Sequence, residues 1–151
     1  MVYYCVMETG TDRKIREHVS DARKTNILGD KDAVANIAVK DLEVARKFYK
    51  DTLGITRVDY EDHEAIVFKS GNSKIIVYRS QYAGTNQATA MTWTVGEDVD
   101  GIVRELKEKG ITFEHYDMPG TTREGDVYVF GKMKVAWFKD PDGNILNIAN
   151  Q

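Results

Sequence analysis

Two stretches of the chain, about 56 residues apart, share one pattern. In each, apolar and polar residues first alternate and then follow the spacing of a helix. In the first stretch, alternation over residues 35–39 predicts a β-strand, because successive side chains of a strand point to opposite faces. Apolar residues at helical spacing follow over residues 42–53. Asp41 is placed to cap the start of this helix and Gly54 to end it.

The second stretch has the same order of patterns. Alternation over residues 91–95 predicts a strand, and Asp98 then precedes an amphipathic run that Gly110 closes. Because the two stretches match in order and length, the sequence predicts a pair of similar structural units.

Short β-rich runs bounded by turn residues follow each helix. They cover residues 55–60, 65–69 and 74–79 in the first half, and residues 111–116, 127–138 with a break at Gly131, and 145–149 in the second. Each half therefore has one helix and four strands, which is an α+β arrangement. A single helix covers only one face of such a sheet, so the other face is left open.

The first strand of each half indicates what the open face looks like. Ile37 with Val39, and Trp93 with Val95, are expected to point toward the helices. The residues of the opposite face are small or polar: Val34, Asn36 and Ala38 in the first half, and Ala90, Thr92 and Thr94 in the second. Such residues suit the wall of a cleft better than a packed core. We therefore expect the functional site on the open faces.

Two segments resemble the glyoxalase, bleomycin-resistance and extradiol-dioxygenase superfamily, also called vicinal oxygen chelate (VOC) proteins. Residues 39–49 with Leu53-Gly54 look like its opening strand and helix, and residues 137–144 look like its closing turn. The resemblance extends from Val34 to the C-terminus. It implies two tandem βαβββ modules, residues 33–81 and 88–151, with curved mixed sheets around a shared cleft and helices on the outer faces. It also implies a small-molecule ligand and a homodimer.

Metal-using members of this superfamily take four ligands, typically His, Gln and Glu, from the first and last strands of both modules. The positions that match them here are Val34, Ala90 or Met91, a residue within 76–78, and Asn147. None is a good donor for a divalent ion. The sequence therefore predicts no metal site and no cofactor, which puts metal-dependent chemistry in doubt.

Six residues are candidates for contact with a ligand, through amide or hydroxyl hydrogen bonds or by aromatic stacking. They are Asn36, Tyr78, Thr92, Trp93, Trp137 and Asn147. Ordinary sheet-surface or core positions are the competing interpretation for these residues.

His115 is the candidate general acid or base. It stands at a strand end just before Pro119-Gly120, and imidazole titrates near neutrality. A structural histidine is the competing interpretation. His18 and His63 lie in charged segments and are expected at the surface.

The composition narrows the possible partners. A net charge of −3 gives no basic excess for nucleic acid, and no apolar run reaches the roughly 20 residues of a membrane-spanning helix. No signal sequence is recognisable, so a cytoplasmic location is expected. The lone Cys5 is expected to be a small buried hydrophobe.

Residues 1–32 lie outside the resemblance. Val2 to Met7 could form an edge strand and Thr11 to Lys24 a short charged helix. An arm that packs on a neighbouring subunit and an extension before a true start at Met7 are equally compatible with the sequence.

Three functions remain open. The leading hypothesis is a metal-independent protein that binds and sequesters a small molecule, as the resistance proteins of the superfamily do. The first alternative is a metal-free isomerase or lyase acting on a small oxygenated metabolite. The second is a metal-dependent glyoxalase or dioxygenase with relocated ligands. Whether the protein is an enzyme stays undecided.

Overall fold

The computed structural model describes residues 27–150. The chain divides into two compact units, residues 1–33 and 34–151. In the described part of the first unit, the Lys31 amide donates to the Leu28 carbonyl in a turn. The strand expected at Val2–Met7, the helix expected at Thr11–Lys24, and Cys5 and His18 within them lie outside the described residues. No helix in residues 27–150 is long and apolar enough to cross a membrane.

The first module contains one helical segment and a four-stranded sheet with the strand order β1-β4-β3-β2. Its elements are β1 (Ala35–Val39), α2 (Leu42–Arg46), the π-helix η1 (Lys47–Thr52), β2 (Arg57–Glu61), β3 (Ala65–Ser70) and β4 (Ser73–Arg79). Strand β1 runs parallel to β4, and the other strand pairs are antiparallel.

The helix of the first module begins and ends where the sequence predicts, but its second half is wider. The Asp41 carboxylate accepts from the Glu43 and Val44 amides, and Gly54 has a φ of 75°. From Lys47 the helix is a π-helix, with a bond from the Leu53 amide to the Phe48 carbonyl. This wider turn accompanies the burial of two adjacent aromatic residues, Phe48 and Tyr49.

The second module repeats the plan with more strands. Its elements are β5 (Thr89–Thr94), α3 (Val99–Glu108), β6 (Phe113–Glu114), β7 (Thr122–Glu124), β8 (Val127–Phe130), β9 (Met133–Lys139) and β10 (Ile145–Ala149). The strand order is β5-β10-β9-β8-β7, and β6 pairs with β9. Only two residues of the strand expected over 111–116 pair with β9, and β7 was not expected from the sequence.

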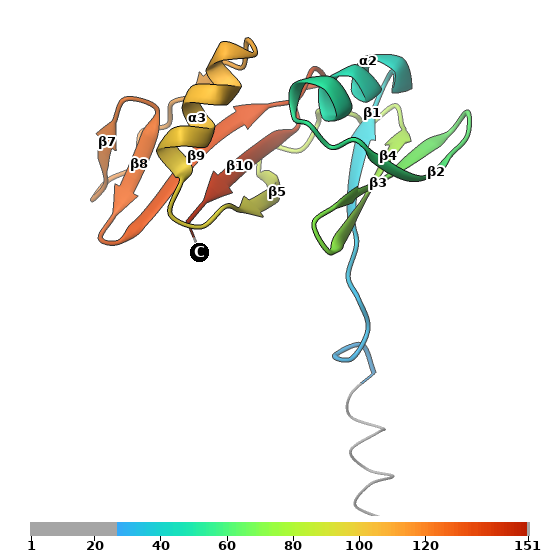
Figure 1. Ribbon diagram of the computed structural model, residues 1–151, viewed down its shortest axis with the longest axis horizontal. Helices are drawn as coiled ribbons and strands as arrows, with labels where there is room; N and C mark the ends of the chain where they lie inside the picture. The colour runs from blue at the N-terminus through green and yellow to red at the C-terminus, as the bar shows by residue number, and fades with distance from the viewer. Residues whose placement is uncertain (1–26, 151) are drawn as a thin grey trace, which may run out of the picture. The chain divides into compact units, whose positions relative to one another are not determined.

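Both sheets are mixed in the same way, because β5 runs parallel to β10 just as β1 runs parallel to β4. Helix α3 lies across one face of its sheet (Figure 1). The described chain is therefore the α+β fold of two βαβββ modules that the sequence predicts, with short extra strands in the second module.

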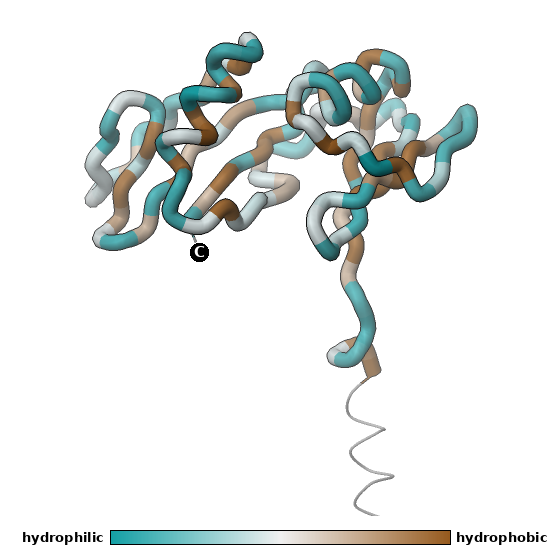
Figure 2. The backbone as a smooth tube through the Cα atoms, viewed as in Figure 1, coloured by the Kyte–Doolittle hydropathy of each residue, from teal (hydrophilic) through white to brown (hydrophobic). Residues whose placement is uncertain are grey.

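The main core lies between each sheet and its helix. On β1, Ile37 and Val39 are almost fully buried while Asn36 is exposed, which is the alternation expected of a strand covered on one face. Many strand residues are apolar, while apolar and polar residues alternate along α3 (Figure 2). Each helix covers only one face of its sheet. The opposite face has no helix and is here called the open face.

A buried carboxylate joins the two modules. Asp140 begins the turn between β9 and β10 and is only 5% exposed. It accepts a 2.9 Å hydrogen bond from the Tyr49 hydroxyl of the first module. Asn144 donates to Asp140 and also to the Ala38 carbonyl of β1, at 2.7 and 2.8 Å. The closing turn of the second module is thereby fastened to the first strand and helix of the first module.

The linker between the modules packs on the same turn. Gly84 has a φ of 71°, and a Cβ built at this residue would lie 1.9 Å from the Asp142 carbonyl oxygen. Only a residue without a side chain fits there, since both the backbone angle and the close approach exclude a Cβ.

We expect Gly84→Ala to lower the free energy of unfolding by about 3 kcal/mol, from the left-handed backbone penalty plus the collision with Asp142. Gly71→Ala is the matched control: its φ is 57°, but nothing lies within 4 Å of the added Cβ, so the backbone penalty of about 1 kcal/mol acts alone. Urea denaturation measures both. Equal losses in the two variants would show that the linker is not tightly packed on the turn.

Tyr49→Phe is expected to lower the free energy of unfolding by about 2 kcal/mol, because the buried Asp140 carboxylate loses a donor. Tyr60→Phe removes a similar bond, 2.7 Å to Asp62, from a residue that is 56% exposed. We expect a much smaller change there, since water replaces the lost partner. A small effect of Tyr49→Phe in the same denaturation experiment would contradict the importance of the junction.

Candidate functional site

The open face of the second sheet is defined by side chains that point away from α3. Leu146 and Ile148 of β10 belong to the main core under the helix, so their neighbours Asn147 and Ala149 lie on the opposite face. In the strand register Asn147 is beside Thr92 of β5 and Trp137 of β9. Three of the residues predicted to contact a ligand are therefore adjacent on one surface.

Aromatic side chains surround Trp137 on this open face. The rings of Tyr116 and Tyr128 lie nearly perpendicular to it, with centroids 5.9 and 5.4 Å from its own. The Tyr128 hydroxyl is held by the Tyr116 backbone, accepting from its amide and donating to its carbonyl. Trp137 donates from Nε1 to the Thr89 hydroxyl at 3.1 Å. The result is a fixed aromatic surface rather than loosely packed side chains.

Two polar atoms buried on or beside this surface have no hydrogen-bond partner within residues 27–150. They are the Asn147 Oδ1 atom and the Tyr116 hydroxyl, and Asn147 as a whole is only 8% exposed. Burial, and then the charge of Glu114, raises the pKa of Tyr116, so its hydroxyl keeps its proton at neutral pH. The surface thus offers one unused acceptor and one unused hydroxyl. A buried polar group without a partner lowers the free energy of unfolding by about 1–3 kcal/mol, so its presence here calls for an explanation.

The open face of the first sheet carries the other two predicted polar residues. In the register Asn36 is beside Ile76, and Tyr78 is beside Ala38, two pairs further along β1 and β4. Tyr78 is 37% exposed, and the Asn36 amide donates to the Val34 carbonyl at 3.2 Å. Both are accessible to a ligand, but they belong to a different sheet from Thr92, Trp137 and Asn147.

Trp93 lies on the opposite side of the second sheet from these residues. It packs against the main core, with its ring stacked on Phe138, and donates from Nε1 to the Ser70 hydroxyl of the first module at 3.0 Å. Trp93 also lines a cavity on this helix-bearing side. The structure therefore separates the two tryptophans predicted to contact a ligand.

His115 is placed away from both open-face groups, next to charged partners. Its Nε2 atom is 2.8 Å from Asp126 Oδ1, and Lys107 of α3 binds the other oxygen of the same carboxylate at 2.6 Å. Hydrogen bonds from Lys107 and then His115 lower the pKa of Asp126. This cluster joins His115 and α3 to the start of β8, and a role of His115 as general acid or base stays a prediction.

The residues at the superfamily's metal-ligand positions do not fit a metal. Val34 and Ile76 contribute only hydrocarbon, and Asn147 offers a neutral amide where metal-using members have Glu. Residues 27–150 contain no group of three or more His, Cys, Asp or Glu side chains that could hold an ion. Neither module supplies good metal donors at the superfamily's ligand positions.

Sequence reasoning missed Tyr116 and Tyr128. Both stand in segments that it predicted as strands, and the alternation there could have assigned each to a face. The sequence could not show that these two rings lie beside Trp137, because the pairing of β6 and β8 with β9 brings them there.

Comparison with known proteins gives a family and a fold. The sequence profile of the Glyoxalase/Bleomycin resistance protein/Dioxygenase superfamily matches residues 32–148. A search of curated protein sequences found no match.

Solved structures of this superfamily resemble the chain at low sequence identity. A glyoxalase family protein from Enterococcus faecalis superposes with a TM-score of 0.62 at 20% identity, covering 81% of this chain and 99% of that one. A bleomycin-binding protein in complex with bleomycin gives 0.60 at 17% identity, covering 80% and 98%. Lactoylglutathione lyase from Agrobacterium tumefaciens gives 0.56 at 18% identity, covering 80% and 94%.

These TM-scores establish the shared fold, and the profile covers the capped first helix and the closing turn. The chain belongs to the Glyoxalase/Bleomycin resistance protein/Dioxygenase superfamily.

Proposed function

We propose that this protein binds a small, partly aromatic molecule on the open faces of its sheets and does so without a metal ion. The observation that carries the proposal is the pair of buried, unpartnered polar atoms beside Trp137, on Asn147 and Tyr116. A bound molecule that stacks on the aromatic surface and hydrogen-bonds to these atoms would offset the cost of burying them.

The amide at residue 147 supports binding rather than metal-assisted chemistry. A neutral Asn can orient a ligand through its oxygen, but it supplies no charge to a cation. The bleomycin-binding neighbour is a protein of this fold in complex with a drug, bleomycin. Sequestration of a compound is thus the function that this site supports best.

A second copy of the chain is the proposed partner that completes the cleft. The open face of the first sheet leaves Tyr78 more than a third exposed, and the second sheet leaves the Trp137 group without a covering helix. A sheet face without a covering helix is commonly packed against another layer. We expect light scattering to give twice the 17.1 kDa chain mass.

Asn147→Leu tests the carrying observation without knowledge of the ligand. Leucine has a similar size and removes the unpartnered oxygen, so we expect the ligand-free protein to become about 1 kcal/mol more stable in urea denaturation. Thr92→Val, on the neighbouring exposed residue, is the control, with an expected change below about 0.5 kcal/mol. Loss of stability in Asn147→Leu would mean that the amide serves the folded structure itself.

A thermal-shift screen of antibiotics and metabolites, bleomycin included, tests the binding directly. We expect at least one compound to raise Tm, to shift the indole N–H nuclear magnetic resonance signal of Trp137, and to be recovered unchanged. Asn147→Leu should weaken its binding about tenfold. Recovery of a chemically altered compound would instead identify an enzyme.

Elemental analysis tests the absence of a metal. We expect less than about 0.1 equivalents of zinc, nickel, iron or manganese per chain after dialysis, and a Tm that a chelator does not change, because the ligand positions hold Val34, Ile76 and Asn147. A retained equivalent of metal, with a lower Tm after chelation, would overturn the metal-free part of the proposal.

A further inference from the structure

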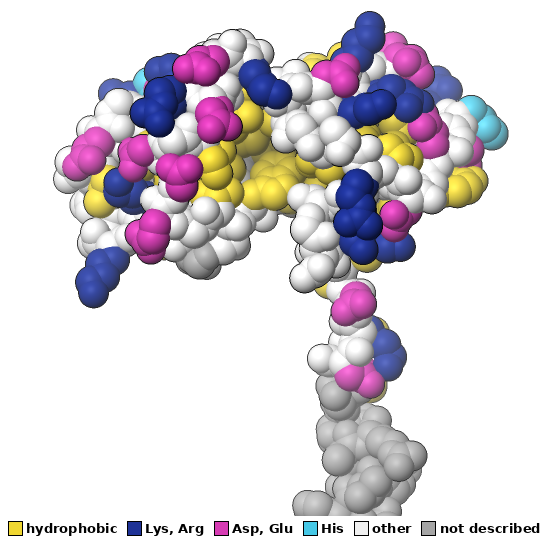
Figure 3. All heavy atoms as spheres, in the orientation of Figure 1, with side chains coloured by type: hydrophobic (Ala, Val, Ile, Leu, Met, Phe, Trp, Pro, Cys, Tyr) yellow, Lys and Arg dark blue, Asp and Glu magenta, His cyan; other side chains and the backbone are white. Residues whose placement is uncertain are grey.

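A cavity of about 520 Å³ lies on the helix-bearing side of the protein, where the two modules meet. Residues 52–57 and 69–71 of the first module form one wall, and β5, α3, β9 and β10 of the second module form the other. Hydrophobic side chains gather in this hollow in the space-filling view (Figure 3). We call it the helix-side pocket. It lies on the opposite side of the second sheet from Trp137 and Asn147, so the proposed function does not use it.

The wall of the helix-side pocket is a part of the main core that is not fully covered. Leu53, Trp93, Val95, Ile102 and Leu106 are only partly buried although they pack against that core. Trp93 and Phe138 are stacked there, with ring planes 16° apart and centroids 6.3 Å apart. The pocket therefore exposes part of the Trp93 ring, backed by the buried Phe138, within an apolar hollow whose volume is typical of small-molecule sites.

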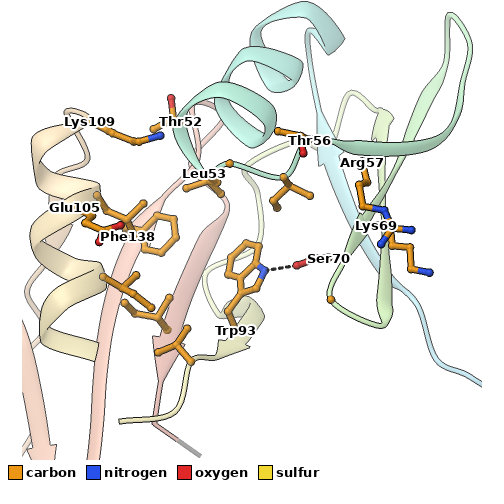
Figure 4. Close-up of a pocket in the computed structure, with 17 residues that line it drawn as sticks. Thr52, Leu53, Thr56, Arg57, Lys69, Ser70, Trp93, Glu105, Lys109 and Phe138 are labelled. Carbon is orange, nitrogen blue, oxygen red and sulfur yellow. Dashed lines mark hydrogen bonds between the residues drawn. The ribbon is translucent and has the colours of Figure 1, made fainter. Parts of the chain in front are cut away.

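Cationic side chains predominate among the charged residues of the pocket. Arg57, Lys69 and Lys109 line it, against the single carboxylate of Glu105, although the chain as a whole has a net charge of −3. Figure 4 places Lys109 at one side of the pocket and Arg57 with Lys69 at the other, beyond Ser70. Lys109 donates from Nζ to the Asp51 carbonyl at 3.2 Å, and the Arg57 and Lys69 side chains extend away from Trp93, so the three cations lie at the rim of the hollow and not inside it.

Arg57 and Lys69 are direct cross-strand neighbours on β2 and β3. Like charges at such positions repel each other and destabilise a sheet by a few tenths of a kcal/mol or more. The nearby Asp59 carboxylate is bonded to Lys74 at 3.0 Å, and among the described residues neither Arg57 nor Lys69 forms an ion pair of its own. The hydrogen bond to Lys74, and then the charges of Lys69 and Arg57, lower the pKa of Asp59, so this carboxylate already offsets part of the repulsion and an anion bound beside the pair would offset more.

We propose that the helix-side pocket is a second ligand site, for a flat apolar molecule that carries an anionic group, such as an aromatic carboxylate or sulfonate. The rings would lie against Trp93 and Phe138, and the anion would lie near the cationic side chains. The depth of the hollow and its excess of positive charge favour this ligand over a flat protein surface, which would need a broader and less charged patch.

The chain has two tryptophans, one at each candidate site, so their indole N–H signals report on the two sites separately. Trp137→Phe and Trp93→Phe assign the signals. The probe is 8-anilinonaphthalene-1-sulfonate, added to the full-length protein. We expect saturable binding of one molecule per chain, with a shift of the Trp93 signal and none of the Trp137 signal.

Two comparisons test the charge requirement. N-Phenyl-1-naphthylamine has the same rings without the sulfonate, and we expect it to bind at least about tenfold more weakly. Lys69→Gln and Lys109→Gln should each weaken binding of the sulfonate severalfold. Lys132→Gln is the control, because Lys132 is an exposed lysine in the turn between β8 and β9 and does not line the pocket. Its effect should be less than about twofold.

Three results would overturn the proposal. A shift of the Trp137 signal alone would place the probe on the open face, which leaves the proposed function intact. Equal affinity for the uncharged probe, or no effect of the two lysine variants, would show unspecific apolar binding. Binding that disappears as protein concentration rises would show that a second copy of the chain covers the pocket.

Discussion

Each sheet of this protein has one helix to cover it, and this limit determines where apolar side chains can be buried. Alternation along the strands sends Ile37 and Val39 into a core under the helix, and it sends Asn36 and Ala38 to the other side. The same division in the second sheet places Leu146 and Ile148 under α3 and Asn147 on the open face. The open faces, and with them the candidate site, follow from a fold with two single-helix modules.

Polar contacts at one turn help to fix the position of the modules relative to each other. Asp140, Asn144 and Tyr49 form a buried set of hydrogen bonds that ties the end of β9 to the first module, and Gly84 lets the linker pass close to Asp142. Burial, with the adjacent Asp140 charge, raises the pKa of Tyr49, so this hydroxyl remains a donor at all physiological pH values. Directional bonds suit this junction because they fix an orientation, which apolar packing alone does less strictly.

The two sides of the second sheet then offer different chemistry. On the open face, Trp137 stands beside an unused amide oxygen and an unused hydroxyl, which favours a ligand held by stacking and hydrogen bonds. On the helix side, Trp93 lies in an apolar hollow that Arg57, Lys69 and Lys109 help to line, which favours an anionic ligand held by burial and charge. In neither place do the side chains of residues 27–150 gather into a metal-binding group.

The sequence by itself determined the features that are local in the chain: the cap at Asp41, the stop at Gly54, most strands, the two repeated modules, and the Asn at residue 147 in place of a carboxylate. Backbone periodicity and capping act within a few residues, so they are legible in the order of amino acids. Tertiary structure alone decided which side chains meet. Tyr116 and Tyr128 reach Trp137 only through the pairing of β6 and β8 with β9. His115 contacts Asp126, which precedes β8. The helix-side pocket has walls from both modules. Such contacts join residues far apart in the chain, and no local pattern encodes them.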